Sequence, residues 1–93
     1  MGKRWPPQTL KDLVSIGPAA LKDFEVLGIE TLEQLAQCDA RSLYEKLGEL
    51  TSGLHDPCVE DVFSAAIAQA KDPTLPKEQR VWHYYSRVRK GDL

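Results

Sequence analysis

The sequence predicts a compact all-α bundle of five or six short helices, and three observations lead to that expectation. From Thr9 onward, apolar residues recur at intervals of three and four, the spacing of one face of a helix. No stretch shows the sustained alternation, rich in β-branched residues, that marks a strand. The 93 residues are 42% hydrophobic and 28% charged, as in an ordinary soluble protein, so we expect a single domain over residues 1–93.

The first two helices are expected on either side of a tight turn. The first covers about residues 8–15, after a pair of prolines, and ends at Gly17. The second begins at Pro18, because proline lacks the N–H that would be unpaired there anyway, and ends at Gly28. Its apolar stripe consists of Leu21, Phe24 and Leu27.

The next three helices also have start and stop signals. Thr31 and Gln34 form a capping box for a third short helix, and Asp39 caps a fourth that ends at about Gly53. A fifth helix, over residues 56–71, opens with Asp-Pro. Its apolar positions are Val59, Val62, Phe63, Ala66, Ile67 and Ala70. We expect this clearest amphipathic helix to be the central core element.

The C-terminal part is expected to be a loop over residues 72–76 and a basic, aromatic helix over residues 77–90. The buried stripe of this helix is expected at Val81, Trp82, Tyr85 and Val88.

Charge and composition exclude several classes of protein. The net charge is -2, which argues against a strongly basic nucleic-acid binder, although both ends are basic and the middle is acidic. The longest uncharged run, residues 63–69, is too short to cross a membrane, and no apolar segment follows the basic N-terminus, so we expect a cytoplasmic protein. The two cysteines are expected to be reduced.

The Ile16-Gly17-Pro18 turn between two apolar-periodic segments resembles the helix-hairpin-helix motif, and with the third and fourth helices the resemblance covers residues 8–50. The family's fold is a compact, SAM-like bundle. The resemblance implies weak, sequence-independent DNA binding, in which backbone amides at the start of the second helix hold a phosphate. The residues that carry this role here are Gly17, Ala19, Ala20 and Lys22.

This hairpin departs from the family's pattern. Family members commonly have a glycine where this chain has Ser15, and a Lys or Arg where it has Ala19 and Ala20. The turn at residues 38–41 contains no glycine. A hairpin that serves only as a packing unit therefore stays open as an alternative.

The pattern of the whole chain resembles the pathogenicity-locus family of small bacterial proteins, many of which carry a mitomycin resistance label. The residues that carry this resemblance are the hairpin, a Leu-Gly-Ile linker, a Leu-Tyr-Glu-Lys-Leu helix, the segment His55-Asp56-Pro57-Cys58, and the basic aromatic tail. The label implies a link to DNA damage but names no reaction.

Cys58 is the one candidate chemical group, because the start of a helix lowers the pKa of a thiol. No catalytic partner accompanies it in the sequence, so we expect a small buried, unreactive residue, with His55 and Asp56 forming the turn and cap. A metal site at Cys38, His55, Cys58 and His83 would need four distant residues to converge and is not expected.

The tail mixes cations with aromatic residues, as nucleic-acid-binding surfaces do, and its freer cations are Arg87, Arg89 and Lys90. Trp5 is placed to pack against this tail and bring the two basic ends together. We therefore expect a monomeric, non-enzymatic DNA-binding module without cofactor or metal. The alternative is an adaptor that docks a protein through its acidic middle or its helical faces, and a redox or resistance enzyme based on Cys58 has the least support.

Overall fold

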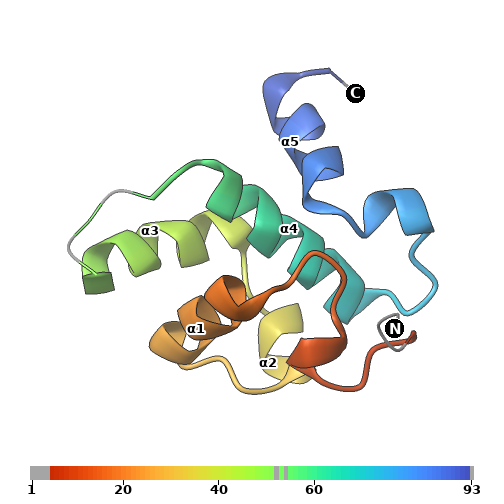
Figure 1. The fold of residues 1–93 in the computed structure, drawn as a ribbon, viewed down its shortest axis with the longest axis horizontal. Helices are drawn as coiled ribbons and strands as arrows, with labels where there is room; N and C mark the ends of the chain where they lie inside the picture. Colours follow the sequence, from red (N-terminus) through yellow and green to blue (C-terminus); the bar gives the residue numbers. More distant parts are fainter. Residues whose placement is uncertain (1–4, 52, 54, 93) are drawn as a thin grey trace.

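The computed structural model describes residues 5–51, 53 and 55–92, and this part of the chain is all-helical, as predicted. In chain order its elements are a 3-10 turn η1 (Leu10–Asp12), the helices α1 (Pro18–Leu27), α2 (Leu32–Ala36), α3 (Ala40–Thr51) and α4 (Cys58–Lys71), a second 3-10 turn η2 (Lys77–Gln79), and α5 (Trp82–Lys90). Figure 1 shows α4 crossing the middle of the molecule, with α1, α2 and α3 on one side of it and α5 on the other. No helix within the described ranges has both the length and the apolar character needed to cross a membrane.

The capping signals that the sequence offers are confirmed. Pro18 is the first residue of α1, and Gly28 ends that helix in the left-handed conformation, with φ of 77°. Thr31 and Gln34 form the expected capping box of α2. Asp39 caps α3, since its carboxylate accepts hydrogen bonds from the Ser42 backbone and hydroxyl, each at 3.0 Å.

The first expected helix, over residues 8–15, is wrong: only one 3-10 turn forms there. The carboxylate of Asp12 accepts hydrogen bonds from the backbone N–H groups of Gln8 and Thr9, which closes a single turn. Leu13 then becomes extended, so that it and Ile16, 0% and 2% exposed, both enter the core. A continuous helix would place these two residues, three apart, on one face, but it would not make the turn into α1.

The last expected helix is broken at Val81, which is extended, so η2 and α5 are separate elements. The carbonyl of Arg80 accepts a hydrogen bond from the side chain of Gln69 at 3.1 Å, and the backbone N–H of Trp82 donates to Ser15 Oγ at 3.1 Å. Both bonds come from distant parts of the chain. Tertiary contacts therefore determine where α5 begins.

The apolar core lies between α4 and the preceding elements. Phe24 of α1 and Phe63 of α4 are both fully buried, and their rings are 5.6 Å apart between centroids. This packing confirms the expectation that the helix over residues 56–71, α4, is a central element of the core. The other buried members of the core are Leu13, Ile16, Leu27, Ile29, Leu35, Leu43, Leu47, Ala66 and Ile67. None of them comes from α5.

A second face of α4 supports α5 through polar groups. Asp61, Ala65 and Gln69, spaced four residues apart, are buried on this face. Asp61 receives two hydrogen bonds from Arg89 of α5, at 2.9 and 3.0 Å. Ser86 is the buried residue of α5. We call Asp61, Gln69, Ser86 and Arg89 the polar interface.

The expected apolar stripe on α5 is wrong at its far end, because Val88 is 46% exposed. The buried Ser86 and the Arg89 that pairs with Asp61 show that the helix is turned so that a small residue and a cation face α4. Trp82 and Tyr85 are half-buried. The ion pair with Asp61 therefore sets the rotation of α5.

Candidate nucleic-acid interface

The turn that leads into α1 is held firmly by the core. Gln69 of α4 accepts a hydrogen bond from the backbone N–H of Val14 at 2.8 Å and donates one to the carbonyl of the same residue at 2.9 Å. Leu13 and Ile16, on either side, are buried. The start of α1 is thus presented by a turn that has little freedom to move.

Ser15 takes an unusual conformation in this turn, with φ of 69°. Glycine adopts that left-handed region freely, whereas another residue costs roughly 1–2 kcal/mol there. This is the position where the helix-hairpin-helix pattern commonly has glycine. Ser15 brings a compensating contact, because its hydroxyl accepts the hydrogen bond from Trp82 that caps α5.

The first amides of α1 face outward without a side-chain cap. Gly17, at the N-cap, is exposed and extended, with φ of -104°, and the N–H of Leu21 donates to its carbonyl. The N–H groups of Ala19 and Ala20 precede the first helical hydrogen bond and have no partner among the described residues. A Cβ added at Gly17 would meet no atom within 4 Å. A side chain at Gly17 therefore has room for its first carbon beside the backbone amides.

The charges nearest to these amides have opposite signs. Lys22 is exposed and lies 4.0 Å from the Glu25 carboxylate, between two side chains that are 70% and 77% exposed, so the pair is weak. Asp23 is half-buried, and desolvation raises the pKa of its carboxyl, opposed by the charge of His55. Lys22 and Asp23 thus place one cation and one acid on α1, close to its uncapped start.

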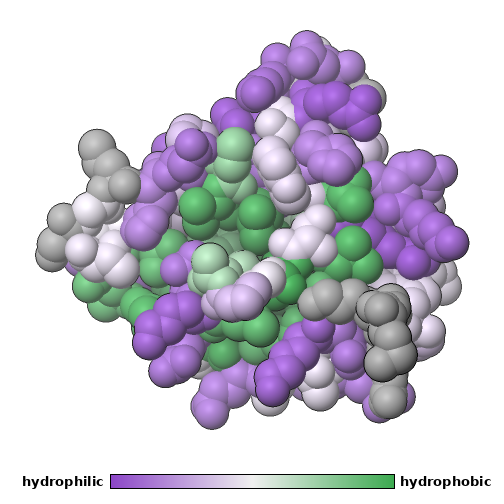
Figure 2. All heavy atoms as spheres, in the orientation of Figure 1, coloured by the Kyte–Doolittle hydropathy of each residue, from purple (hydrophilic) through white to green (hydrophobic). Residues whose placement is uncertain are grey.

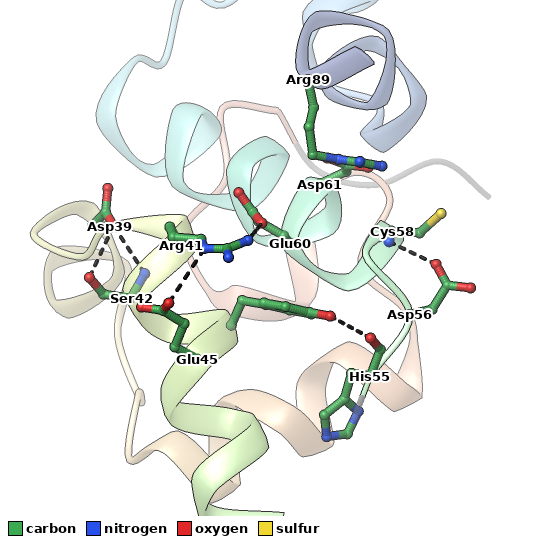
Figure 3. Close-up of polar contacts among 11 residues, drawn as sticks. Asp39, Arg41, Ser42, Glu45, His55, Asp56, Cys58, Glu60, Asp61 and Arg89 are labelled. Carbon is green, nitrogen blue, oxygen red and sulfur yellow. Dashed lines mark hydrogen bonds and ion pairs between the residues drawn. The ribbon is translucent and has the colours of Figure 1, made fainter. Parts of the chain in front are cut away.

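A hollow of about 350 Å³ on α3 belongs to the acidic middle of the chain. Glu45 and Glu49 line it with Tyr44 and His55, and the Tyr44 hydroxyl donates a hydrogen bond to the His55 carbonyl. Figure 3 shows Glu45 also reached by Arg41, at 3.6 Å. Its carboxylates make this hollow unsuited to a phosphate.

A smaller hollow of about 270 Å³ opens beside the start of α1, and we call it the α1 hollow. It is lined by Ser15, Gly17, Pro18, Ala19, Ala20, Asp23, Val59 and Val62. Three of the four residues predicted to bind phosphate, Gly17, Ala19 and Ala20, are thus brought together on its rim. In Figure 2, apolar atoms gather over α4 beside the start of α1, while hydrophilic atoms cover much of α5. The walls of this hollow are apolar, and its charged group is Asp23.

The cations of α5 divide into two kinds. Arg87 and Lys90 are exposed and have no ion-pair partner in the described part of the chain. Arg89, expected to be free, is bound to Asp61, which also raises the pKa of its guanidinium. Arg80 stacks on Trp5, 3.7 Å from the ring centroid, which places Trp5 against the tail as expected. The basic residues Lys3 and Arg4 lie outside the described residues.

Cys58 is the first residue of α4 and is half-buried rather than enclosed (Figure 3). Its backbone N–H donates to the Asp56 carboxylate at 2.9 Å. A hydrogen bond to Asp56, partial burial and the charges of Asp56 and Asp61 raise the pKa of the thiol. This raised pKa disfavours the thiolate, which is the reactive form of a cysteine.

Sequence reasoning missed the residues that position this site. Gln69 and Asp61 looked like solvent-facing positions of α4, yet both are buried. Their spacing of eight residues, with Ala65 midway, could have indicated a second buried face. Val59 and Val62 were assigned to the core, but they also line the α1 hollow. Within the described residues, no cluster of His, Cys, Asp and Glu is arranged to hold a metal ion.

The fold and the site define a small all-helical protein whose candidate interface is the uncapped start of α1 and the apolar hollow beside it. The chain belongs to the pathogenicity locus family, whose model matches residues 4–91. It is 35% identical over 81 residues to the mitomycin resistance protein McrB of Streptomyces lavendulae, an alignment that covers 87% of this chain and 73% of the relative. No solved structure matches the chain.

Proposed function

We propose that this protein is a non-enzymatic module that binds DNA weakly and without regard to sequence, through the amides at the start of α1. The observation that carries the proposal is the uncapped helix start on a firmly held turn. The N–H groups of Ala19 and Ala20 have no partner in the part of the chain that the structure describes, and Gly17 leaves the backbone open to close approach. Such amides, together with the helix dipole, favour an anion such as a phosphate.

The proposed interface also includes cations from two elements. Lys22 lies on the first turns of α1, and Arg87 and Lys90 lie toward the end of α5. The start of α5 is bonded to the turn before α1 through Ser15. Lys90 is eight positions after Trp82, so the two lie about 12 Å apart along the axis of α5 at 1.5 Å per residue, which equals about three to four base steps along a duplex. Arg89 is left out of the proposed interface because it pairs with Asp61.

A link to drug resistance accords with this proposal. The relative from Streptomyces lavendulae is named for mitomycin resistance. A small module that binds DNA independently of sequence would contribute to such resistance at the DNA itself, without modifying the drug. No catalytic constellation surrounds Cys58 in the described residues, and the raised pKa of its thiol disfavours a nucleophilic role.

Fluorescence anisotropy with a labelled duplex at low salt tests the proposal. We expect weak binding with a salt slope of about -2 to -3, because Lys22, Arg87 and Lys90 would each release about one counterion. Gly17→Val should fold, since a Cβ at this position meets no atom within 4 Å, and should weaken binding by blocking the amides. Arg87→Glu should weaken binding and flatten the slope, whereas Lys46→Glu on α3 is the matched control.

Absence of duplex binding at low salt would overturn the proposal and favour the adaptor alternative. That alternative has its own observation, because Leu50 is 53% exposed at the end of α3, near the acidic hollow. In that case, Leu50→Glu should abolish the co-purification of a partner, while Arg87→Glu should not.

A further inference from the structure

The α1 hollow has a feature that phosphate binding leaves unused: an apolar cavity directly beside the phosphate-binding amides. Its walls include Val59 and Val62 of α4, and Gly17, Ala19 and Ala20 contribute to both the cavity and the helix start. Its volume of about 270 Å³ is smaller than the roughly 300–1,000 Å³ of pockets that hold drug-sized ligands. It therefore suits a single ring system.

Resting on the proposed function, we propose that the α1 hollow takes one unstacked nucleobase while a phosphate of the same strand lies against the α1 amides. The protein would then bind single-stranded or frayed DNA in preference to intact duplex. The two halves of a nucleotide meet matching chemistry here: the apolar walls receive the flat face of the base, and the amides receive the phosphate. Protein sites that read single strands commonly combine these two kinds of contact.

Asp23 gives the hollow a preference among bases. It is half-buried and has no hydrogen-bond partner among the described residues. A carboxylate at the rim accepts two hydrogen bonds from guanine, whose Watson–Crick edge carries N1–H and N2–H side by side. Thymine offers one N–H between two carbonyl oxygens, and these oxygens repel the carboxylate. Guanine is therefore the expected occupant.

An intact duplex cannot use this hollow, because its Watson–Crick edges are paired and its bases are stacked. Duplex binding should then depend on the amides and cations alone. This difference separates the inference from the proposed function, since one requires an accessible base and the other only a phosphate backbone.

Anisotropy titrations with three labelled DNAs test the inference: a thymine oligonucleotide with one central guanine, the all-thymine strand, and the duplex of the first strand. For the native protein we expect the guanine strand to bind at least about fivefold more tightly than the duplex. The loss of one base contact typically lowers affinity by about this factor. Val59→Phe fills the hollow and should abolish this preference, so that the guanine strand and the duplex bind with similar affinity. Val26→Phe is the matched control, because Val26 is 40% exposed on α1 and does not line the hollow.

If Val59→Phe does not fold, Asp23→Asn provides a second test of the inference. This variant should fold, because the change is isosteric and Asp23 is only half-buried. The Asp23→Asn variant should show a smaller preference for the guanine strand. Its affinity for the duplex should be equal or higher, because the substitution removes an acid beside the proposed phosphate site. If Asp23→Asn only destabilised the fold, binding to the guanine strand and binding to the duplex would both weaken.

Two results would overturn the inference and leave the proposed function standing. One is equal affinity of the native protein for the guanine strand and the duplex. The other is a preference for the guanine strand that survives in both Asp23→Asn and a folded Val59→Phe. Absence of binding to all three DNAs would overturn the proposed function and the inference together.

Discussion

The two sides of α4 are held to their neighbours by different forces. On one side, Phe63 packs against Phe24 in a core of fully buried apolar residues. On the other side, Asp61 pairs with Arg89 of α5, and Gln69 donates a hydrogen bond to the carbonyl of Arg80 just before that helix begins. Asp61, Gln69 and Ser86 are the buried polar residues of the described chain. Each of these groups depends on a particular partner, whereas the apolar side chains need only fill space.

This difference implies that the apolar core provides most of the free energy of folding. The polar interface instead fixes where α5 and the turn before α1 lie. Removing apolar area should unfold the whole molecule. Breaking a polar contact should instead loosen α5 and the turn before α1 while α1 to α4 stay folded. The following experiments test that contrast, in order of expected effect.

Phe63→Ala should lower the free energy of unfolding by about 3–5 kcal/mol, because it leaves a cavity in a fully buried site. Most of the stability of a domain of this size would be lost. Urea unfolding followed by circular dichroism measures the change. A loss below about 1 kcal/mol would show that α4 is not the centre of the core.

Gln69→Leu should cost about 2–3 kcal/mol, because Val14 and Arg80 would keep partly buried backbone groups without their partner. In this variant, the backbone amides of the turn before α1 and of the start of α5 should both lose protection from hydrogen exchange. Gln37→Leu, at an exposed position, is the control. Unchanged protection at both segments would show that Gln69 does not join them.

Asp61→Asn should cost about 1–2 kcal/mol, less than a fully buried pair, because the Arg89 side chain is 33% exposed and solvent screens its charge. The effect should be confined to α5, whose amides should exchange faster while those of α1 and α3 do not. Glu78→Gln removes an exposed carboxylate as the control. Equal acceleration throughout the chain would mean that α5 and the core unfold as one unit.

The smallest expected effect concerns the reactivity of the Cys58 thiol. Because Asp56 and Asp61 raise the pKa of its thiol above the ordinary value of about 9.0, little thiolate forms at pH 7, and native Cys58 should react with iodoacetamide more slowly than the unfolded chain. Asp56→Asn should speed the reaction. The measurement uses a Cys38→Ala background and mass spectrometry. Fast native labelling at pH 7 would restore the redox hypothesis.

Local signals in the sequence predicted most of the side with the core. Pro18, Gly28 and the Thr31–Gln34 pair define helix ends through their own backbone chemistry, so they required no knowledge of the rest of the chain. The apolar repeat of α4 likewise predicted its core face, because burial of that face is the dominant driving force.

The side with the polar interface could not be predicted in the same way. Ser15 caps a helix 67 residues further along the chain, and Gln69 binds Val14 from 55 residues away. Such pairs leave no periodic trace in one sequence. The break of the last helix at Val81 follows from these contacts, and the exposed Val88 follows from the pairing of Arg89 with Asp61. The single turn at residues 10–12 instead reflects local hydrogen bonds to Asp12. At the candidate site, the hairpin residues were predicted, but the apolar wall from Val59 and Val62 was not.

The hydrogen bonds of Gln69 also have a consequence for the order of folding. They can be completed only after Val14 and Arg80 have both reached α4, so two chain loops of very different length must close first. The apolar contacts among α1, α3 and α4 impose no such double condition and can form earlier. Changes at Gln69 should therefore accelerate unfolding and leave the refolding rate nearly unchanged, whereas changes at Phe63 should slow refolding. A side chain that completes the structure last would thus govern how long the finished turn before α1 persists.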